Sequence, residues 1–134
     1  MSIAVLLVED MKQIRGVVAD LLASLGDFQV VGEAATEAEA KLWLEEHPGA
    51  WDLAIVDLIL EQGTGMGVVS KCRERPGAGK VVVFSDYATP GIRQHCLQLG
   101  ADQVFQKNSD VPAFIAYCSS LAGPGAAPAT ARRM

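Results

Sequence analysis

The sequence has little of what marks a disulfide-rich or zinc-binding protein. It has only three cysteines, an odd number, and none of them stands in a C-x-x-C pair. This count and spacing argue against a disulfide framework and against a structural zinc site. We therefore expect Cys72, Cys96 and Cys118 to be reduced thiols that pack inside a cytoplasmic protein.

Long hydrophobic runs and positive charge are also missing. No apolar stretch approaches the roughly 20 residues of a membrane-spanning helix, and no basic region precedes an apolar segment at the N-terminus. The sequence thus predicts neither membrane insertion nor a secretion signal. The net charge of −5 argues against binding of nucleic acid through a basic face, so no direct DNA binding is expected.

Apolar residues, by contrast, are plentiful. Half of the 134 residues are hydrophobic, which is enough for one domain with its own core. We expect this domain to span residues 1–122. Residues 123–134 are rich in glycine, proline and alanine, so they are predicted to form a flexible tail in which Arg132 and Arg133 are solvated.

Short apolar runs alternate with segments of helical periodicity, which predicts an α/β fold with a parallel sheet and helices on both of its faces. Thr36 and Thr89 are expected to cap the starts of the second and fourth helices. Gly26 is expected to end the first helix as a C′ residue, and the fourth helix is expected to stop at Gly100. The expected helices are residues 12–25, 36–47, 66–75, 90–100 and 110–122.

The polarity of the predicted strands constrains their order in the sheet. The runs that end at Val8, Val56 and Phe84 are apolar on both faces, as buried central strands require. The runs at 28–32 and 103–106 carry polar residues and suit the two edges. This arrangement predicts the flavodoxin-like, doubly wound strand order 2-1-3-4-5.

Polar residues follow the strands of this predicted sheet, at the point where each strand ends. Glu9 and Asp10 follow the first strand, Asp57 the third, Ser85 the fourth and Lys107 the fifth. Because parallel strands end at the same edge of a sheet, these residues are expected to share one crevice.

The residues of this crevice predict phosphoryl chemistry with a metal. Clustered carboxylates repel one another unless a cation lies among them, and hard oxygen ligands at a partly hydrated edge suit Mg²⁺. Asp57 is the candidate nucleophile, because a carboxylate beside a metal can attack phosphorus and form an aspartyl phosphate. Glu9 and Asp10 are the candidate metal ligands, while Lys107 and Ser85 are expected to contact the phosphoryl oxygens.

Over roughly residues 2–122 this pattern resembles the receiver domains of bacterial two-component response regulators. The resemblance depends on several short pieces that stand together in the family's order and spacing, since each piece alone is unspecific. The matching pieces are residues 8–10, 56–58 and 63–66, Ser85, residues 100–102 and Lys107.

The resemblance implies a signalling switch rather than an enzyme with a separate substrate. Asp57 would accept a phosphoryl group from a sensor histidine kinase or a phosphotransfer protein. Mg²⁺ would be the cofactor, held by Glu9, Asp10, Asp57 and the backbone carbonyl of Ile59. The added charge of about −2 would then stabilise one of two arrangements of the protein.

The resemblance also implies that the fourth helix, fifth strand and fifth helix form the output face. No DNA-binding or enzymatic domain follows residue 122, so a stand-alone receiver that signals through protein contacts is expected. A downstream protein and a second copy of the chain are both open as partners. The candidate contacts are Arg93, Gln94, Gln98 and Tyr117.

Three residues depart from the family pattern near the crevice and the output face. Val104 stands where the family often has a switch aromatic, and Phe105 is expected to point to the opposite side of the strand. Asn108 replaces the usual proline after the lysine, and Asp86 adds a carboxylate near the crevice.

Two bulky residues occupy positions that influence loss of the phosphoryl group in the family. These are Ile59, two residues after Asp57, and Tyr87, two residues after Ser85. Because both side chains would hinder an attacking water, a long-lived phosphorylated state is predicted.

Two other functions are open to a chain with this sequence. A pseudo-receiver would keep the fold for protein contacts without phosphorylation. Val104, Asp86 and Asn108 favour it, whereas retention of all five site residues argues against it. A phosphatase of the haloacid-dehalogenase type would also form an aspartyl phosphate. That chemistry needs a second acid two residues after the nucleophile, where this chain has Ile59, so the sequence argues against it.

Overall fold

The computed structural model describes residues 2–74 and 79–122, and within them one five-stranded sheet is flanked by helices. The strands are β1 (Ile3–Val8), β2 (Phe28–Ala34), β3 (Leu53–Val56), β4 (Lys80–Phe84) and β5 (Gln103–Phe105). The helices are α1 (Lys12–Leu25), α2 (Glu37–Glu46), α3 (Gly65–Cys72), α4 (Pro90–Leu99) and α5 (Val111–Ala122).

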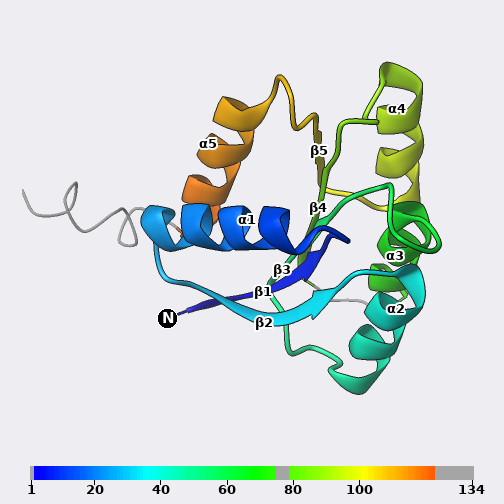
Figure 1. Cartoon of the computed structure of the whole chain (residues 1–134), viewed down its shortest axis with the longest axis horizontal. Coiled ribbons are helices and arrows are strands. Elements are labelled where there is room, and N and C mark those ends of the chain that lie inside the picture. The colour runs from blue at the N-terminus through cyan, green and yellow to red at the C-terminus, as the bar shows by residue number, and fades with distance from the viewer. Residues whose placement is uncertain (1, 75–78, 123–134) are drawn as a thin grey trace, which may run out of the picture.

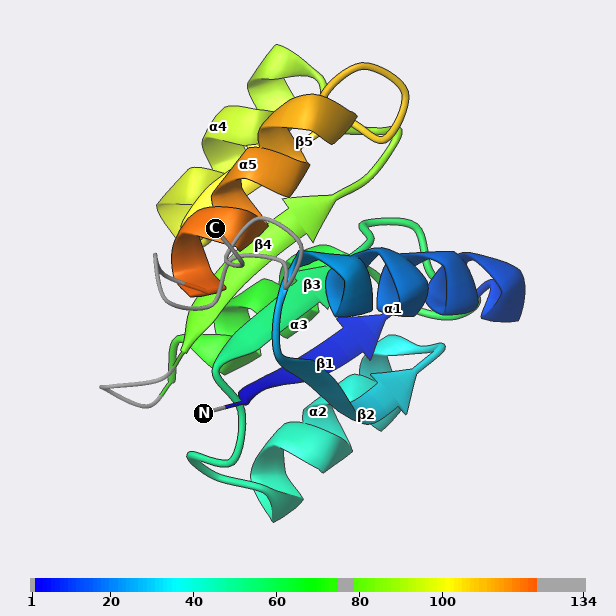
Figure 2. The same cartoon turned by 90° about the vertical axis from the view of Figure 1, so that its left-hand side faces the viewer.

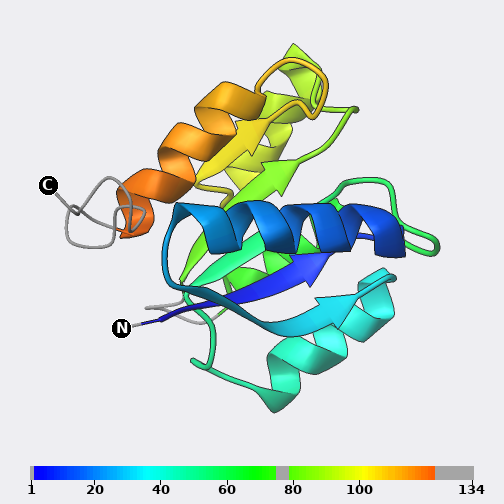
Figure 3. The ribbon, with the colours of Figure 1, turned by 60° about the vertical axis from the view of Figure 1, so that its left-hand side comes forward.

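All neighbouring strands are parallel, and their order is β2-β1-β3-β4-β5. Figure 1 shows α1 and α5 on one face of this sheet and α2, α3 and α4 on the other. Figure 3 shows α1 and α5 side by side on their common face. The predicted flavodoxin-like topology is therefore confirmed.

Burial follows the strand order as the sequence predicts. Every residue of β3, at the centre of the sheet, is buried. In β2, at one edge, exposed residues alternate with half-buried ones. One face of β2 is therefore exposed to solvent, whereas helices cover both faces of β3.

The helix ends match the predictions with three differences. Thr89 stands at the predicted N-cap position of α4, but its side chain makes no capping hydrogen bond. The Oγ1 atom of Thr36 accepts the N–H of Glu39 at 3.1 Å, and Gly100 ends α4 with a left-handed φ of 115°. The carboxylate of Glu39 turns back to the N–H of Ala35, at 2.8 Å, one residue outside the usual capping box. Gly26 follows α1 with a φ of 165°, which is extended and not the left-handed C′ conformation that we expected.

Other boundaries also differ from the predicted ones. Helix α3 begins at Gly65, because Thr64 caps it by accepting the N–H of Gly67 at 3.4 Å. It ends at Cys72. Strand β2 continues to Ala34, past its predicted end. Residue 75, predicted to end the third helix, and the predicted tail at 123–134 lie outside the described residues. Among the residues that are described, no helix is both long and apolar enough to span a membrane.

The apolar core is divided by the sheet into two clusters. Val104 lies in the cluster on the side of α2, α3 and α4, and Phe105 in the cluster on the side of α1 and α5. The predicted opposite orientation of these two residues is therefore confirmed. Cys72, Cys96 and Cys118 are all buried and unpaired, as expected for packing thiols.

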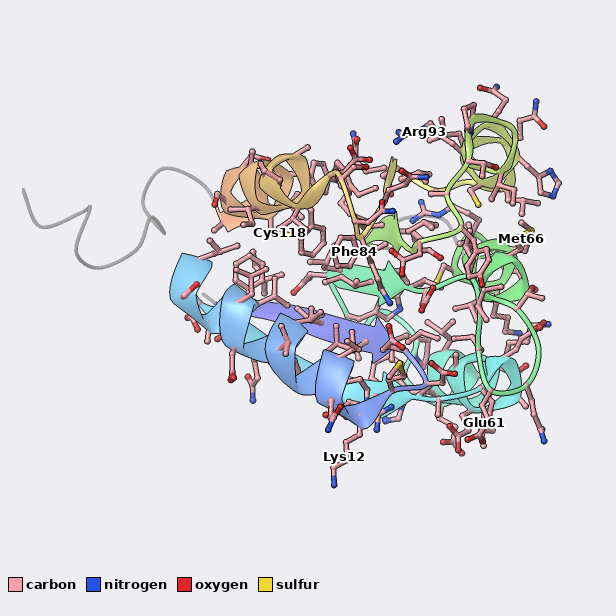
Figure 4. All side chains as sticks on the ribbon, turned by 45° about the horizontal axis from the view of Figure 1, so that its top comes forward. Lys12, Glu61, Met66, Phe84, Arg93 and Cys118 are labelled. Carbon is pink, nitrogen blue, oxygen red and sulfur yellow. The ribbon has the colours of Figure 1, made fainter. Side chains whose placement is uncertain are left out.

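Helix α5 is anchored on the sheet by a stack of aromatic rings. Phe114 is fully buried, and its ring stacks on that of Phe84 with centroids 4.3 Å apart. The Phe105 ring meets Phe114 edge-on at 5.9 Å. In Figure 4, Phe84 lies beneath α5, the helix that carries Cys118. These rings fix the position of one helix of the predicted output face.

We predict that Phe114→Ala lowers the free energy of unfolding by about 3–5 kcal/mol, because it empties the centre of this stack. Leu97→Ala on α4, where the side chain is 39% exposed, is the matched control and should change stability by only about 0.5 kcal/mol. Urea denaturation of both variants measures the difference. Equal losses for the two variants would contradict the anchoring role of Phe114.

Candidate functional site

The ends of β1, β3 and β4 bring the predicted site residues to one edge of the sheet. Val8 pairs with Val56, so Glu9 and Asp57 leave their strands at the same level, and Val56 pairs with Val83, two residues before Ser85. Figure 2 shows the arrowheads of the central strands pointing toward the same edge. The sheet bonding continues into the site, since the N–H of Asp57 donates to the carbonyl of Val8 at 2.9 Å.

This edge buries charge. Glu9 is 7% exposed and Asp57 is 8% exposed, although both are carboxylic acids. The ammonium Nζ of Lys107 lies 2.5 Å from Oε1 of Glu9 and 2.9 Å from Oδ2 of Asp57. Lys107 thus bridges two buried carboxylates that belong to different strand ends.

The pKa values of this cluster record the competition between burial and pairing. The pKa of Glu9 is raised, chiefly by burial and further by its hydrogen bond with Asp10, although the hydrogen bonds from Lys107 and the N–H of Met11 lower it. For Lys107, burial disfavours the charged form, but the bonds to Glu9 and Asp57 outweigh it and raise the pKa. Lys107 is therefore charged at neutral pH.

Three carboxylates lie together at this edge of the sheet, and Lys107 bridges only two of them. Oxygen atoms of Glu9, Asp10 and Asp57 all lie within 4.8 Å of one another. One ammonium cannot neutralise three carboxylates, so the cluster retains negative charge. This donor set fits a divalent cation such as Mg²⁺, which takes hard oxygen ligands and keeps several of its waters. Asp10 is only half-buried, so water can reach this side of the cluster.

Ser85 is the site residue that follows β4. Its side chain is fully buried, and its Oγ accepts the N–H of Tyr87 at 3.2 Å. That bond uses an oxygen lone pair and leaves the hydroxyl hydrogen able to donate. Two backbone hydrogen bonds join Ser85 to the end of β5. Its N–H donates to the carbonyl of Phe105 at 3.0 Å, and its own carbonyl accepts the N–H of Lys107 at 3.3 Å.

The other residues predicted near the site are exposed. Ile59 is 50% exposed and Tyr87 is 55% exposed. The N–H of Ile59 donates to Oδ1 of Asp57 at 3.4 Å, whereas the role of its carbonyl as a metal ligand stays a prediction. Asp86 is exposed and is not a member of the carboxylate cluster.

Sequence reasoning missed two residues that position this site. Arg15 of α1 donates from Nη1 to the carbonyl of Glu9 at 2.5 Å and from Nε to Glu33 at 2.7 Å, so it fixes the acidic loop against β2. At Gly65 an added Cβ would lie 2.0 Å from the carbonyl oxygen of Asp57, so a larger residue would displace the site backbone. Neither role has a local sequence signal, because both depend on contacts between elements.

We predict opposite effects of Glu9→Gln on stability and on metal binding. The pKa of Glu9 is raised above its ordinary value of 4.5 in the folded protein. Its protonated form therefore contributes to the free energy of unfolding fully below pH 4.5, and this contribution is lost as the pH rises through the pKa of the folded state. Without metal, Glu9→Gln, whose side chain is always neutral, should therefore become more stable than the wild type as the pH rises from 4.5 to neutrality. Urea titrations in a chelator, at several pH values, measure this.

The same variant should lose most of the increase in melting temperature that Mg²⁺ gives the wild type, because a metal ligand is removed. Asp86→Asn removes an exposed carboxylate outside the cluster and should retain the wild-type increase. A stability difference between Glu9→Gln and wild type that is the same at all pH values would refute the assigned cost of burying Glu9.

Comparisons with known proteins agree with this fold. The model of the response regulator receiver domain family matches residues 5–118. The chain is 32% identical over 109 residues to the photosynthetic apparatus regulatory protein RegA of Cereibacter sphaeroides, a match that covers 78% of this chain and 58% of RegA. It spans about half the length of the curated relatives it matches.

Solved structures share the fold at lower sequence identity. A chain of the CheX–CheY–BeF3–Mg complex from Borrelia burgdorferi matches with a TM-score of 0.79 and 21% identity, covering 89% of this chain and 88% of that one. The Mn²⁺-bound form of response regulator Rcp1 matches with a TM-score of 0.72 and 19% identity, covering 90% of this chain and 92% of that one.

Proposed function

Because the chain belongs to the response regulator receiver domain family, we propose that it is a signalling switch that accepts a phosphoryl group on Asp57. The observation that carries this proposal is the position of Asp57. It is buried at the sheet edge, clustered with Glu9 and Asp10, and paired with Lys107 at 2.9 Å. A structural ion pair would not need two further carboxylates at the same place.

In the proposed reaction, an oxygen of the Asp57 carboxylate attacks the phosphorus atom of an acyl phosphate or a phosphohistidine. A new P–O bond forms as the donor's own P–O or P–N bond breaks. The donor leaves as a carboxylate or, with a proton bound, as neutral imidazole. Lys107 supplies a fixed positive charge to the phosphoryl oxygens, and the Ser85 hydroxyl donates a hydrogen bond to one of them.

Glu9, Asp10, Asp57 and the backbone carbonyl of Ile59 would hold the magnesium ion. Bound there, Mg²⁺ supplies positive charge that stabilises the oxygens of the transferring group. The structural neighbours support this cofactor, since one is a complex with BeF3 and magnesium and another is a Mn²⁺-bound form.

The proposed donor is a sensor histidine kinase or a phosphotransfer protein, and the protein acts as a phosphoacceptor rather than as an enzyme on a separate substrate. A cytoplasmic location, predicted from the sequence, is part of this proposal. The assignment of a stand-alone protein that signals through protein contacts is a proposal as well.

We place the output on the face of α4, β5 and α5. Gln94 and Gln98 are exposed there. Arg93 is paired with Asp110 at 3.2 Å, so it links α4 to the start of α5. Tyr117 is half-buried, with its ring 6.1 Å from that of Phe105. Of the four candidate contacts, the two glutamines are therefore the ones most available to a downstream protein or to a second copy of the chain.

A phosphorylation-independent pseudo-receiver is the second candidate, and one observation favours it. Val104 is buried on the α4 side of β5, where the family often has a switch aromatic. The aromatic residue of β5, Phe105, packs on the α5 side instead. Phosphorylation of Asp57 distinguishes the two candidates, since a pseudo-receiver would not take up the phosphoryl group.

We predict that incubation with acetyl phosphate adds one phosphoryl group to the wild type only when Mg²⁺ is present. Asp57→Asn should add none, because an amide lacks the nucleophilic oxygen. Intact-protein mass spectrometry measures both results. Asp52→Asn is a control at the opposite end of β3 and should be modified like the wild type. An unmodified wild type, with several phosphodonors tried, would favour the pseudo-receiver.

We predict that the Ile59→Ala/Tyr87→Ala double variant loses its phosphoryl group several-fold faster than the wild type, because both bulky side chains, each two residues from a site residue, would hinder the attacking water. Leu42→Ala removes a side chain of α2 that is 55% exposed and should keep the wild-type lifetime. The decay of the phosphorylated mass after removal of the donor measures the lifetime. Loss from the wild type within seconds would contradict the prediction.

A further inference from the structure

The loop that follows Asp57 is bonded to the first residue of α2. This loop, residues 58–64, connects β3 to α3. Oε1 of Glu37 accepts the N–H of Thr64 at 2.8 Å. The backbone N–H of Glu37 donates to the carbonyl of Gln62 at 3.0 Å. One residue of a neighbouring helix thus contacts the loop through both its side chain and its backbone.

Two glycines make room for the Glu37 side chain. A Cβ atom on Gly63 would lie 2.4 Å from Cβ of Glu37, and Gly63 also has a left-handed φ of 80°. A Cβ atom on Gly67 would lie 2.1 Å from Oε2 of Glu37, and its three closest neighbours are all Glu37 atoms. With Gly65 against the Asp57 carbonyl, the three glycines of residues 63–67 each leave space for a specific neighbour.

Backbone contacts continue from Thr64 to the site itself. Ile59 and Thr64 form an antiparallel bridge across the loop, and the N–H of Gly65 donates to the carbonyl of Leu58 at 3.0 Å. The N–H of Ile59 donates in turn to Oδ1 of Asp57. A continuous path of contacts therefore leads from the Glu37 carboxylate to the Asp57 carboxylate.

Two further contacts keep the loop and Glu37 in place. The N–H of Glu61 donates to the carbonyl of Ala35 at 3.3 Å, and Figure 4 shows Glu61 beside α2. The ammonium of Lys41 lies 2.6 Å from Oε2 of Glu37, one helical turn along α2. Lys41 and the N–H of Thr64 lower the pKa of Glu37, so its carboxylate is charged at neutral pH.

We propose that Glu37 is a positioning residue, whose carboxylate holds the 58–64 loop so that the backbone of Ile59 is set for metal binding and phosphoryl transfer at Asp57. The part that concerns phosphoryl transfer depends on the function proposed above. The part that concerns the loop and the metal does not, and it can be measured on the unphosphorylated protein.

Three variants of α2 separate the contacts of Glu37. Glu37→Ala removes the bond to Thr64, whereas Glu37→Gln keeps an oxygen that can accept it. Lys41→Ala removes only the ion pair. Glu39→Ala is the matched control, because it removes the bond to Ala35 at the same helix end and leaves the loop bond in place.

The expected result is specific to the loop. In Glu37→Ala, amide hydrogen exchange should become faster in residues 58–64, and half-saturation by Mg²⁺ should need about fivefold more metal, the equivalent of one hydrogen bond of about 1 kcal/mol. The phosphorylation rate should fall strongly at low Mg²⁺ and recover largely at saturating Mg²⁺. Glu37→Gln, Lys41→Ala and Glu39→Ala should stay near the wild type in all three measurements.

Gly67→Ala tests the same contact from the opposite side. Its new methyl group would displace the Glu37 carboxylate, so it should reproduce the loop exchange and the Mg²⁺ requirement of Glu37→Ala. In the Glu37→Ala background the methyl group has space, and alanine favours the helix over glycine. In that background Gly67→Ala should cause no further change in loop exchange or Mg²⁺ requirement. It should raise the free energy of unfolding there, whereas it should lower it in the wild type.

The outcomes are distinguishable from failure of the proposed function. Unchanged loop exchange and unchanged Mg²⁺ half-saturation in both Glu37→Ala and Gly67→Ala would overturn the positioning role, even if the wild type is phosphorylated. If the wild type takes up no phosphoryl group while both variants show the expected exchange and metal effects, the positioning role is supported and the proposed function alone fails. A defect in Glu39→Ala equal to that of Glu37→Ala would also overturn the role, since it would show that the loop depends on the whole start of α2 and not on the Glu37 carboxylate.

Discussion

Electrostatic repulsion among three carboxylates at one edge of the sheet is the constraint on which the site depends. Glu9 and Asp57 are buried, and Asp10 lies close enough to share a cation with them. Burial of like charges is unfavourable unless positive charge or hydrogen bonds compensate it. Lys107 compensates part of it by bridging two of the three carboxylates. The remaining negative charge suits a divalent cation, so the proposed chemistry would follow from an unfavourable arrangement that the fold maintains.

The fold maintains this arrangement through its backbone. Parallel strands in register bring Glu9, Asp57 and Ser85 to neighbouring positions, and the sheet bonds continue past the strand ends. Loops complete the site by contacts with other elements, such as that of Arg15 with the carbonyl of Glu9. The two backbone bonds between Ser85 and the end of β5 form a connection from the crevice to the proposed output face. That connection does not need an aromatic residue at Val104.

Local sequence patterns were sufficient for the strand order and for the identity of the gathered residues. The apolar runs that end at Val8, Val56 and Phe84 indicate central strands, and in a parallel sheet the next residues must share an edge. The same patterns did not predict the conformation of Gly26 or the start of α3 at Gly65. A glycine after a helix is compatible with several conformations, and the cap at Thr64 is fixed partly by Glu37, which is distant in sequence.

The supporting contacts could not be predicted from the sequence for the same reason. Glu37 looks like an ordinary acid in the first turn of a helix, and Gly63 and Gly67 look like turn residues. Their relation becomes visible only when α2 and the loop after Asp57 are placed together.

Whether Asp57 itself carries the phosphoryl group is tested most directly by borohydride reduction of the protein after treatment with acetyl phosphate and Mg²⁺. Reduction converts an aspartyl phosphate to homoserine, which peptide mass spectrometry assigns to one position. Homoserine at position 57, formed only with Mg²⁺, is the predicted result. Homoserine at another aspartate, or a phosphoryl group on the intact protein without homoserine, would contradict it.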